Sequence, residues 1–202
     1  AREAGFTDVE MTMAPKGFEG AALRFPNQAR FHPAKYLYGL AAALMAKGVK
    51  LYSDSHVEAF KEENGEVIAT LVNGATVTAR IGVVATNSPI NDKVAIHTKQ
   101  APYRTYVLAA RAPKGACPDA LIWDTEDPYH YVRVQPGDGD DIVLIGGEDH
   151  KSGQEDDGEE RVAKLRAWAE ARIPGLGETT HAWSGQVYEP IDYIPHMGRN
   201  PG

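Results

Sequence analysis

The stretch WDTEDPYHYVR, residues 123–133, gathers side chains suited to binding a charged small molecule. If it forms a strand, alternation places Tyr129, Tyr131 and Arg133 on one face and His130 on the other. An arginine side chain binds a carboxylate through two parallel hydrogen bonds, so this face would suit an anionic ligand. Aromatic residues that alternate along a strand also serve as packing or cross-strand pairs, and this purely structural interpretation stays open.

A second group combines acidic and histidine side chains, the types that hold metal ions in hydrolytic enzymes. Its members are Glu148, Asp149, His150, Asp124, Asp127 and His130. The sequence contains neither an H-E-x-x-H motif nor a repeated H-x-D spacing. Acidic residues after Gly146-Gly147 are more typical of a strand end with solvated charges. We therefore predict no metal site.

The stretch RIGVVATNSPI, residues 80–90, predicts a buried strand that ends abruptly. The apolar run Ile81 to Ala85 has the length of a strand, and Asn87, Ser88 and Pro89 end it. In open α/β sheets ligands bind at the carboxyl ends of strands, so this turn is a candidate binding segment.

Composition excludes several classes of partner. The 202 residues carry a formal net charge of −7, and 43% of them are hydrophobic, which is enough for a globular core. An acidic chain without a basic cluster is not expected to bind nucleic acid or an anionic membrane. The one cysteine, Cys117, cannot form an internal disulfide, which fits a reducing, cytoplasmic location.

The elements that would position these residues form two groups. In the first, a helix is predicted from Pro33 to Gly48, followed by a strand over 49–53 and a meander whose turns are Asn64-Gly65 and Asn73-Gly74. In the second, strands are predicted over 105–111, 120–125, 129–134, 141–147 and 181–188, together with a short strand over 21–26. An apolar stripe predicts another helix, with Val162, Leu165, Trp168, Ala169 and Ile173 on one face.

The segments HPAKYLYGL, ATNSP and WSGQVYEP, with the Asn-Gly meander between the first two, resemble the flavin-dependent amine and amino-acid oxidoreductases of the D-amino-acid oxidase and glycine oxidase type. The resemblance covers about residues 20–200. It implies an α+β or α/β fold with a large, mixed but mostly antiparallel substrate-domain sheet and an incomplete FAD-binding domain that contains the meander. The implied boundaries are 1–30 and 91–184 for substrate binding, and 31–90 and 185–202 for the partial FAD-binding domain.

The resemblance also implies which residues contact the cofactor FAD. Val57 would approach the adenine through its backbone, and Ala85, Thr86 and Asn87 would lie beside the ADP part, with Gly198 near the flavin. The family usually has Gly where Asn87 stands. The sequence contains no G-x-G-x-x-G turn, so we expect a central fragment that holds no FAD by itself.

The implied activity is oxidation of a C–N bond in a small amine or amino acid. Trp183 and Gln186 would line the substrate cavity with the Tyr129, Tyr131 and Arg133 row. Where the glycine-oxidase branch has an arginine that holds the substrate carboxylate, this chain has Val187, so Arg133 or Arg104 would have to replace that clamp. The alternative is a non-catalytic module that binds a ligand or a partner and retains only a vestigial flavin site.

Overall fold

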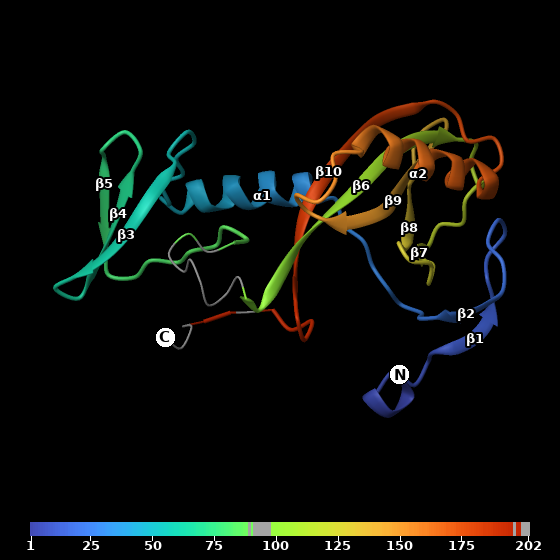
Figure 1. Cartoon of the computed structure of the whole chain (residues 1–202), viewed down its shortest axis with the longest axis horizontal. Coiled ribbons are helices and arrows are strands. Elements are labelled where there is room, and N and C mark those ends of the chain that lie inside the picture. The colour runs from blue at the N-terminus through green and yellow to red at the C-terminus, as the bar shows by residue number, and fades with distance from the viewer. Residues whose placement is uncertain (89, 91–97, 196, 199–202) are drawn as a thin grey trace. The chain divides into compact units, whose positions relative to one another are not determined.

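The computed structural model describes residues 1–88, 90, 98–195 and 197–198, and the chain divides into two compact units. The larger unit consists of Ala1–Arg24 and His97–Gly202, and the smaller unit is Phe25–Ile96 (Figure 1). The assignment of substrate and cofactor roles to segments of the chain stays a prediction.

Strands outnumber helices in both units. The elements are η1 (Arg2–Ala4), β1 (Glu10–Met13), β2 (Ala21–Arg24), α1 (Pro33–Ala46), β3 (Val57–Glu63), β4 (Glu66–Leu71), β5 (Thr76–Ala79), β6 (Gln100–Ala112), β7 (Leu121–Trp123), β8 (His130–Gln135), β9 (Asp141–Lys151), α2 (Gly158–Arg172) and β10 (Thr179–Pro190). None of the helices in the described ranges combines the length and the apolar character that a bilayer crossing requires.

The larger unit is built on a five-stranded sheet with the order β10-β6-β9-β8-β7. Every pair of neighbouring strands in it is antiparallel. Helix α2 packs on one face of this sheet (Figure 1). The predicted mixed fold with a large antiparallel sheet is therefore confirmed.

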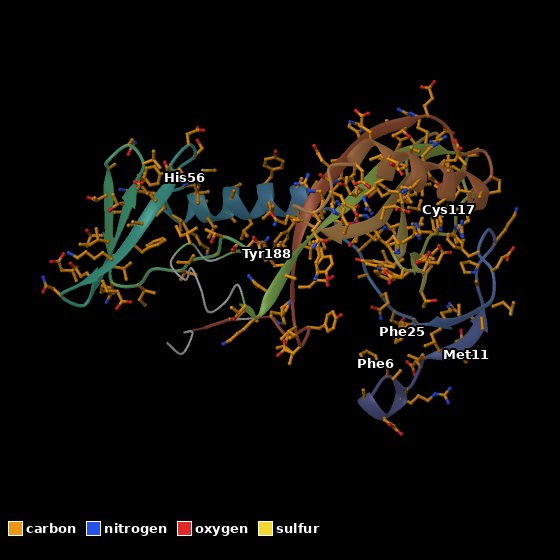
Figure 2. The ribbon with its side chains drawn as sticks, viewed as in Figure 1. Phe6, Met11, Phe25, His56, Cys117 and Tyr188 are labelled. Carbon is orange, nitrogen blue, oxygen red and sulfur yellow. The ribbon has the colours of Figure 1, made fainter. Side chains whose placement is uncertain are left out.

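The core of the larger unit lies between α2 and the sheet. Leu165, Ala169 and Ile173 are buried at a spacing of four residues, which is one stripe of a helix. They meet a row of buried strand residues that includes Leu108 and Ile145. Figure 2 shows the side chains that fill this layer. The predicted apolar face of the second helix is confirmed.

The N-terminal hairpin belongs to the same unit. Strand β1 pairs with β2 in antiparallel register, which confirms the short strand predicted over 21–26. Phe18, in the loop between them, packs on the ring of Trp168 at a centroid distance of 6.0 Å. This contact ties the hairpin loop to helix α2.

The smaller unit contains α1 and the three-stranded sheet β3-β4-β5. Helix α1 begins where predicted, with Pro33 in its first turn and His32 Nδ1 accepting a hydrogen bond from the Lys35 amide at 3.4 Å. The β3–β4 turn has φ of 53° at Asn64 and 80° at Gly65, as the predicted two-residue hairpin requires.

The second Asn-Gly pair forms a different turn. Only Gly74 has a positive φ, 84°, and the Leu71 amide donates to the Ala75 carbonyl at 2.8 Å. The Asn73 side chain accepts from the Ala75 amide at 3.0 Å, which stabilises the longer loop. The meander is confirmed, but Asn73-Gly74 does not form the two-residue hairpin turn that this dipeptide favours.

Two predicted strands of the smaller unit are not formed. Residues 49–53 are irregular, and so are residues 81–85, where Ile81 is 78% exposed and Val83 is 80% exposed. A strand needs a neighbour that accepts its backbone hydrogen bonds. In the described part of the chain the sheet ends at β5, and no strand lies beside 81–85. The prediction of a buried strand at this position was therefore wrong.

Candidate functional site

A single row of residues crosses all five strands of the large sheet. The row consists of Trp183 on β10, Val107 on β6, Gly146 on β9, Tyr131 on β8 and Trp123 on β7. Directly paired residues of antiparallel strands point to the same face. The neighbours of this row in sequence, such as Leu108, Ile145 and Val132, pack in the core under α2, so the row lies on the opposite face. We call the face that carries this row the open face.

The absence of a side chain at Gly146 shapes the row. A Cβ atom at this position would lie 2.0 Å from Cζ of Tyr131, so the tyrosine ring lies directly across the glycine. The hydroxyl of Tyr131 thereby reaches β6, where it is 3.4 Å from Oγ1 of Thr105. The ring of Tyr129 lies 6.2 Å from that of Tyr131. Three polar side chains from two distant segments are thus brought together on the open face.

A bulge in β9 adds a carboxylate to this group. The β6–β9 register shifts between Arg104 and Tyr106, so β9 has one extra residue opposite Thr105. At this bulge Glu148 has a φ of 57°, and its side chain lies on the helix side, 3.4 Å from Nε2 of His130. The next residue, Asp149, interacts instead with the side chains of Thr105 and Tyr129 on the open face.

Helix α2 holds the bulge in place through Arg161. Its guanidinium donates to the Glu148 carbonyl at 3.0 Å and to Oδ1 of Asp157 at 2.9 Å, and it also binds Glu155. The Arg161 side chain is largely buried. It therefore links the first turn of α2 to the strand segment that presents Asp149.

The group on the open face, Thr105, Tyr129, Tyr131 and Asp149, has perturbed proton equilibria. Burial, followed by the Asp149 carboxylate, raises the pKa of Tyr129 to about 12. Burial also raises the pKa of Tyr131, and it raises the pKa of Asp149 above its ordinary value. Both tyrosines therefore keep their protons at neutral pH and act as hydrogen-bond donors. Perturbed titratable groups gathered on one surface are a feature of functional sites.

The structure confirms the predicted alternation along β8. His130 is buried under α2, whereas Tyr131 and Arg133 are half-buried on the open face. Arg133 is paired with Leu144 and Leu121. Whether the row binds substrate stays a prediction.

The residues predicted on β10 point to two different faces. Trp183 pairs with Val107 on the open face, whereas Gln186 pairs with Arg104 on the helix side. The Arg104 guanidinium approaches Oγ of Ser184 at 3.5 Å on that side. The structure therefore places Trp183 on the same face as the tyrosines, with β6 and β9 between their strands, and it places Gln186 and Arg104 on the other face.

The residues predicted to contact FAD lie at a strand end and in exposed loops. Val57 begins β3 and pairs with Leu71. Residues 85–87 are exposed, and Asn87 has a φ of 65°. This left-handed conformation is the one that glycine adopts readily and asparagine tolerates, which is compatible with Asn87 at the position where the resemblance implies Gly. Gly198, in the other unit, has a φ of 121°.

The acidic and histidine side chains that were considered as metal ligands are divided between different environments. His150 stacks on Tyr106 and its Nε2 lies 3.0 Å from the Tyr106 hydroxyl, whereas Asp149 faces the open side. Asp124, Glu126 and His130 do bring three possible ligand atoms within 4.8 Å of one another.

The contacts of His130 are those of a structural side chain. It is 4% exposed and stacks on Trp168 at a centroid distance of 4.3 Å. Asp124 accepts from the His130 amide at 2.7 Å and lies 2.8 Å from its Nδ1. The Arg172 guanidinium lies over the Trp168 ring of this stack, with its Cζ atom 4.3 Å from the ring centroid. The cluster anchors the start of β8 to α2.

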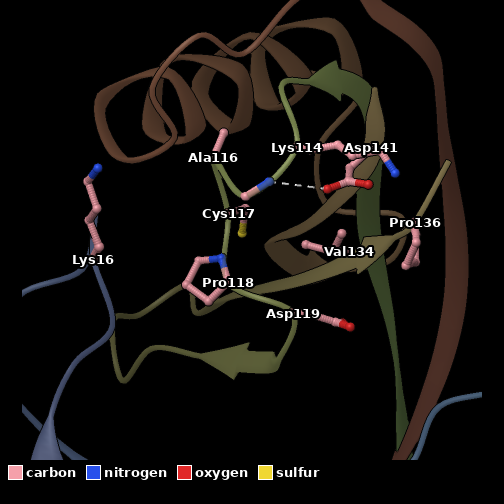
Figure 3. A pocket seen from close by; sticks show the side chains of 10 residues that line it. Lys16, Lys114, Ala116, Cys117, Pro118, Asp119, Val134, Pro136 and Asp141 are labelled. Carbon is pink, nitrogen blue, oxygen red and sulfur yellow. Dashed lines mark hydrogen bonds between the residues drawn. The ribbon is translucent and has the colours of Figure 1, made fainter. Parts of the chain in front are cut away.

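A cavity of about 310 Å³ lies elsewhere in the larger unit, around Cys117 (Figure 3). The Gly115 amide donates to Oδ2 of Asp141 at 3.4 Å across this cavity. Burial raises the pKa of the Cys117 thiol to about 11, so the thiol stays protonated and is a poor nucleophile at neutral pH. The cavity around Cys117 is therefore a weaker candidate for a catalytic site than the open face.

Sequence reasoning missed Asp149 as a partner of the tyrosines. It grouped Asp149 with Glu148 and His150 because the three are adjacent in sequence. The bulge that separates their directions arises from the pairing of β9 with β6. The one local signal was Gly146-Gly147, since paired glycines in a strand often mark a bulge or a close approach.

Comparison with known proteins gives a consistent result. The family described as FAD dependent oxidoreductase matches residues 5–202. A Rieske 2Fe-2S iron-sulfur protein of Bacillus subtilis, YhfW, is 29% identical over 179 residues, which are 88% of this chain and 34% of that protein. The chain thus spans about a third of this relative.

Two solved structures share the fold. Glycine oxidase from Geobacillus kaustophilus has a TM-score of 0.78 at 18% identity, over 99% of this chain and 56% of that chain. L-proline dehydrogenase from P. horikoshii has a TM-score of 0.70 at 20% identity, over 91% of this chain and 50% of that chain. At these identities the likeness concerns the fold.

Proposed function

Because the chain belongs to the FAD dependent oxidoreductase family, whose cofactor is FAD, we propose that it carries the substrate-facing sheet of an enzyme that oxidises a C–N bond of an amine or amino acid. The structural neighbours named as glycine oxidase and proline dehydrogenase support this reaction class. When bound, FAD accepts the hydride from the substrate carbon. The protein therefore has to bind, orient and desolvate the substrate.

The observation that carries the proposal is the chemistry of the open face. Helix α2 covers one face of the sheet, whereas the other presents the row from Trp123 to Trp183 and the polar group around Asp149. Large, partly exposed aromatic residues on one sheet face are typical of a binding surface. In this proposal the tyrosine hydroxyls orient the substrate and the tryptophans exclude water.

The smaller unit supplies the proposed cofactor contacts. Residues 85–87 offer exposed backbone without bulky side chains, which fits the close approach of a nucleotide. Thr86 Oγ1 donates to the Ser88 carbonyl at 2.7 Å and so fixes the turn. We assign residues 31–90 to the flavin-binding part and keep 185–202, with Gly198, as a segment that contacts the flavin.

The first experiment is to purify the complete gene product and record its absorbance spectrum. We expect a yellow protein with stoichiometric FAD, whose flavin bands bleach when amines or amino acids are added without oxygen. The 202-residue chain alone should be colourless, since its sequence has no G-x-G-x-x-G turn. A complete protein that cannot bind FAD would refute the proposal and favour the non-catalytic binding module.

A matched pair of variants tests the cofactor contact. Asn87→Val places a β-branched residue at a φ of 65° and should lower the FAD content, whereas Asn87→Gly should keep it. Asn64→Val introduces the same strain at a φ of 53° in the β3–β4 turn and serves as the control. Equal FAD loss in both valine variants would show a general folding defect instead of a contact with the cofactor.

A further inference from the structure

Asp149 is a carboxylate whose hydrogen-bonding capacity is only partly used. It is half-buried, and its Oδ1 atom is shielded from solvent with no hydrogen-bond partner. Its neighbours on the open face, Thr105 and Tyr129, are neutral hydroxyl groups. A carboxylate partly removed from water is stabilised most strongly by a positive charge.

The basic residues that act electrostatically on Asp149 are bound to other groups. They are His150 and Arg161. His150 bonds to the Tyr106 hydroxyl at 3.0 Å and approaches the Lys151 carbonyl at 3.0 Å. Arg161 is held by Asp157 and by the Glu148 carbonyl on the helix side. Among the described residues, Asp149 therefore forms no ion pair, although one of its oxygen atoms is shielded from water.

The side chains around Asp149 also suit a cation. Asp149 interacts with Tyr129 and Tyr131, whose rings lie 6.2 Å apart, and the row continues across the sheet to Trp183. Aromatic faces attract ammonium groups through their quadrupoles. A carboxylate among aromatic rings is a binding arrangement for a protonated amine.

The basic residues on this part of the open face are Lys151, which pairs with Tyr103 two residues beyond Asp149 on β9, and Arg133 on β8, and neither forms an ion pair with Asp149 within the described part of the chain. Arg133 is four residues from Tyr129 along an extended segment, roughly 13 Å at about 3.3 Å per residue, and Tyr131 stands between them. On β10, two residues beyond the partner of Thr105, the open face carries the apolar side chain of Val187.

We propose that Asp149 binds the ammonium group of the substrate and selects amines without an α-carboxylate over α-amino acids. This inference rests on the proposed C–N oxidation and adds its substrate class. Tyr129 and Tyr131 position the ammonium group against the carboxylate. Asp149 is a binding and specificity residue, and no proton or hydride transfer is assigned to it.

The test compares n-butylamine with norvaline, and further pairs built the same way, on the FAD-loaded complete gene product. The members of each pair differ by the α-carboxylate alone. Anaerobic flavin bleaching gives the apparent affinity and rate for each compound. We expect the wild type to favour the amine of a pair by at least about tenfold, and Asp149→Asn to weaken amine binding by about tenfold or more.

Three further variants separate a specific role from a structural one. Asp149→Glu should recover part of the amine preference, since it restores the charge. Asp138→Asn, a change of the same type in an exposed loop, should leave the preference unchanged. FAD content shows whether each variant folds, and the preference of the wild type tests the inference without any variant.

The inference is overturned if the wild type favours the amino acid of each pair, or if Asp149→Asn keeps the amine preference. If Arg133→Ala loses amino-acid oxidation whereas Asp149→Asn keeps it, Arg133 binds the substrate instead of Asp149. In these outcomes a substrate still reduces the flavin, so the proposed oxidation of a C–N bond is not refuted. If no compound reduces the flavin of a folded, FAD-loaded protein, the proposed function itself fails and the inference falls with it.

Discussion

Replacing Gly146 by alanine should displace Tyr131 from the open face. The added Cβ would lie 2.0 Å from Cζ and 2.3 Å from the hydroxyl oxygen of Tyr131. Ordinary contacts begin near 3.4 Å, so the ring must withdraw by about 1.4 Å. The hydroxyl then loses its contact with Thr105, which is already 3.4 Å long.

Two opposing effects determine how Gly146→Ala changes the free energy of unfolding. Overpacking a close contact costs about 1 to 3 kcal/mol. Replacing glycine by alanine where the backbone tolerates it returns about 0.4 to 1 kcal/mol, because the unfolded chain loses freedom. Gly146 is not one of the described glycines with a positive φ, so its backbone tolerates alanine and this gain applies. We expect Gly146→Ala to lower the free energy of unfolding by about 1 to 2 kcal/mol.

The assay is urea unfolding of the chain followed by tryptophan fluorescence. All three tryptophans, Trp123, Trp168 and Trp183, lie in the larger unit, so the signal reports on the sheet that contains Gly146. In a Tyr131→Ala background, Gly146→Ala should be neutral or stabilising. The double-mutant cycle should therefore give a coupling free energy of about 1 to 3 kcal/mol.

Gly185→Ala is the matched control, because a Cβ at this position of the same sheet meets nothing within 4 Å. It should be neutral or slightly stabilising. A coupling free energy near zero between Gly146 and Tyr131 would refute the explanation of how the glycine shapes the open face. An equal loss of stability in Gly185→Ala and Gly146→Ala would refute the same explanation.

The other predictions concern the core and the thiol. Leu165→Ala, at a fully buried site under the sheet, should cost about 2.7 to 5 kcal/mol of unfolding free energy in urea, whereas Leu23→Ala, at a site that is 58% exposed, should cost less than about 1 kcal/mol. Because the pKa of Cys117 is raised from 9.0 to about 11 on folding, the unfolded thiol loses its proton first, and its contribution to stability should fall as pH rises from 9 to 11. The difference in unfolding free energy between the wild type and Cys117→Ala across this range measures the effect, and a pH-independent difference would contradict it.

Local patterns in the sequence determined much of the fold. The Asn64-Gly65 hairpin, the start of α1 at Pro33 and the apolar stripe of α2 depend on residues close in sequence, and all three are present. The alternation that separates His130 from Tyr131 and Arg133 is also local, because adjacent residues of any strand point to opposite faces. The sequence therefore predicted which side chains of β8 share a face.

Only the tertiary structure decided which residues meet Tyr131. Asp149 reaches the open face because β9 has one residue more than β6 at their pairing, and that mismatch joins segments about forty residues apart. The same dependence on partners explains the wrong prediction at 81–85, where an apolar run without a neighbouring strand stays irregular. Periodicity gives the direction of a side chain within its own strand, whereas register and bulges depend on hydrogen bonds between distant strands, which a local pattern does not contain.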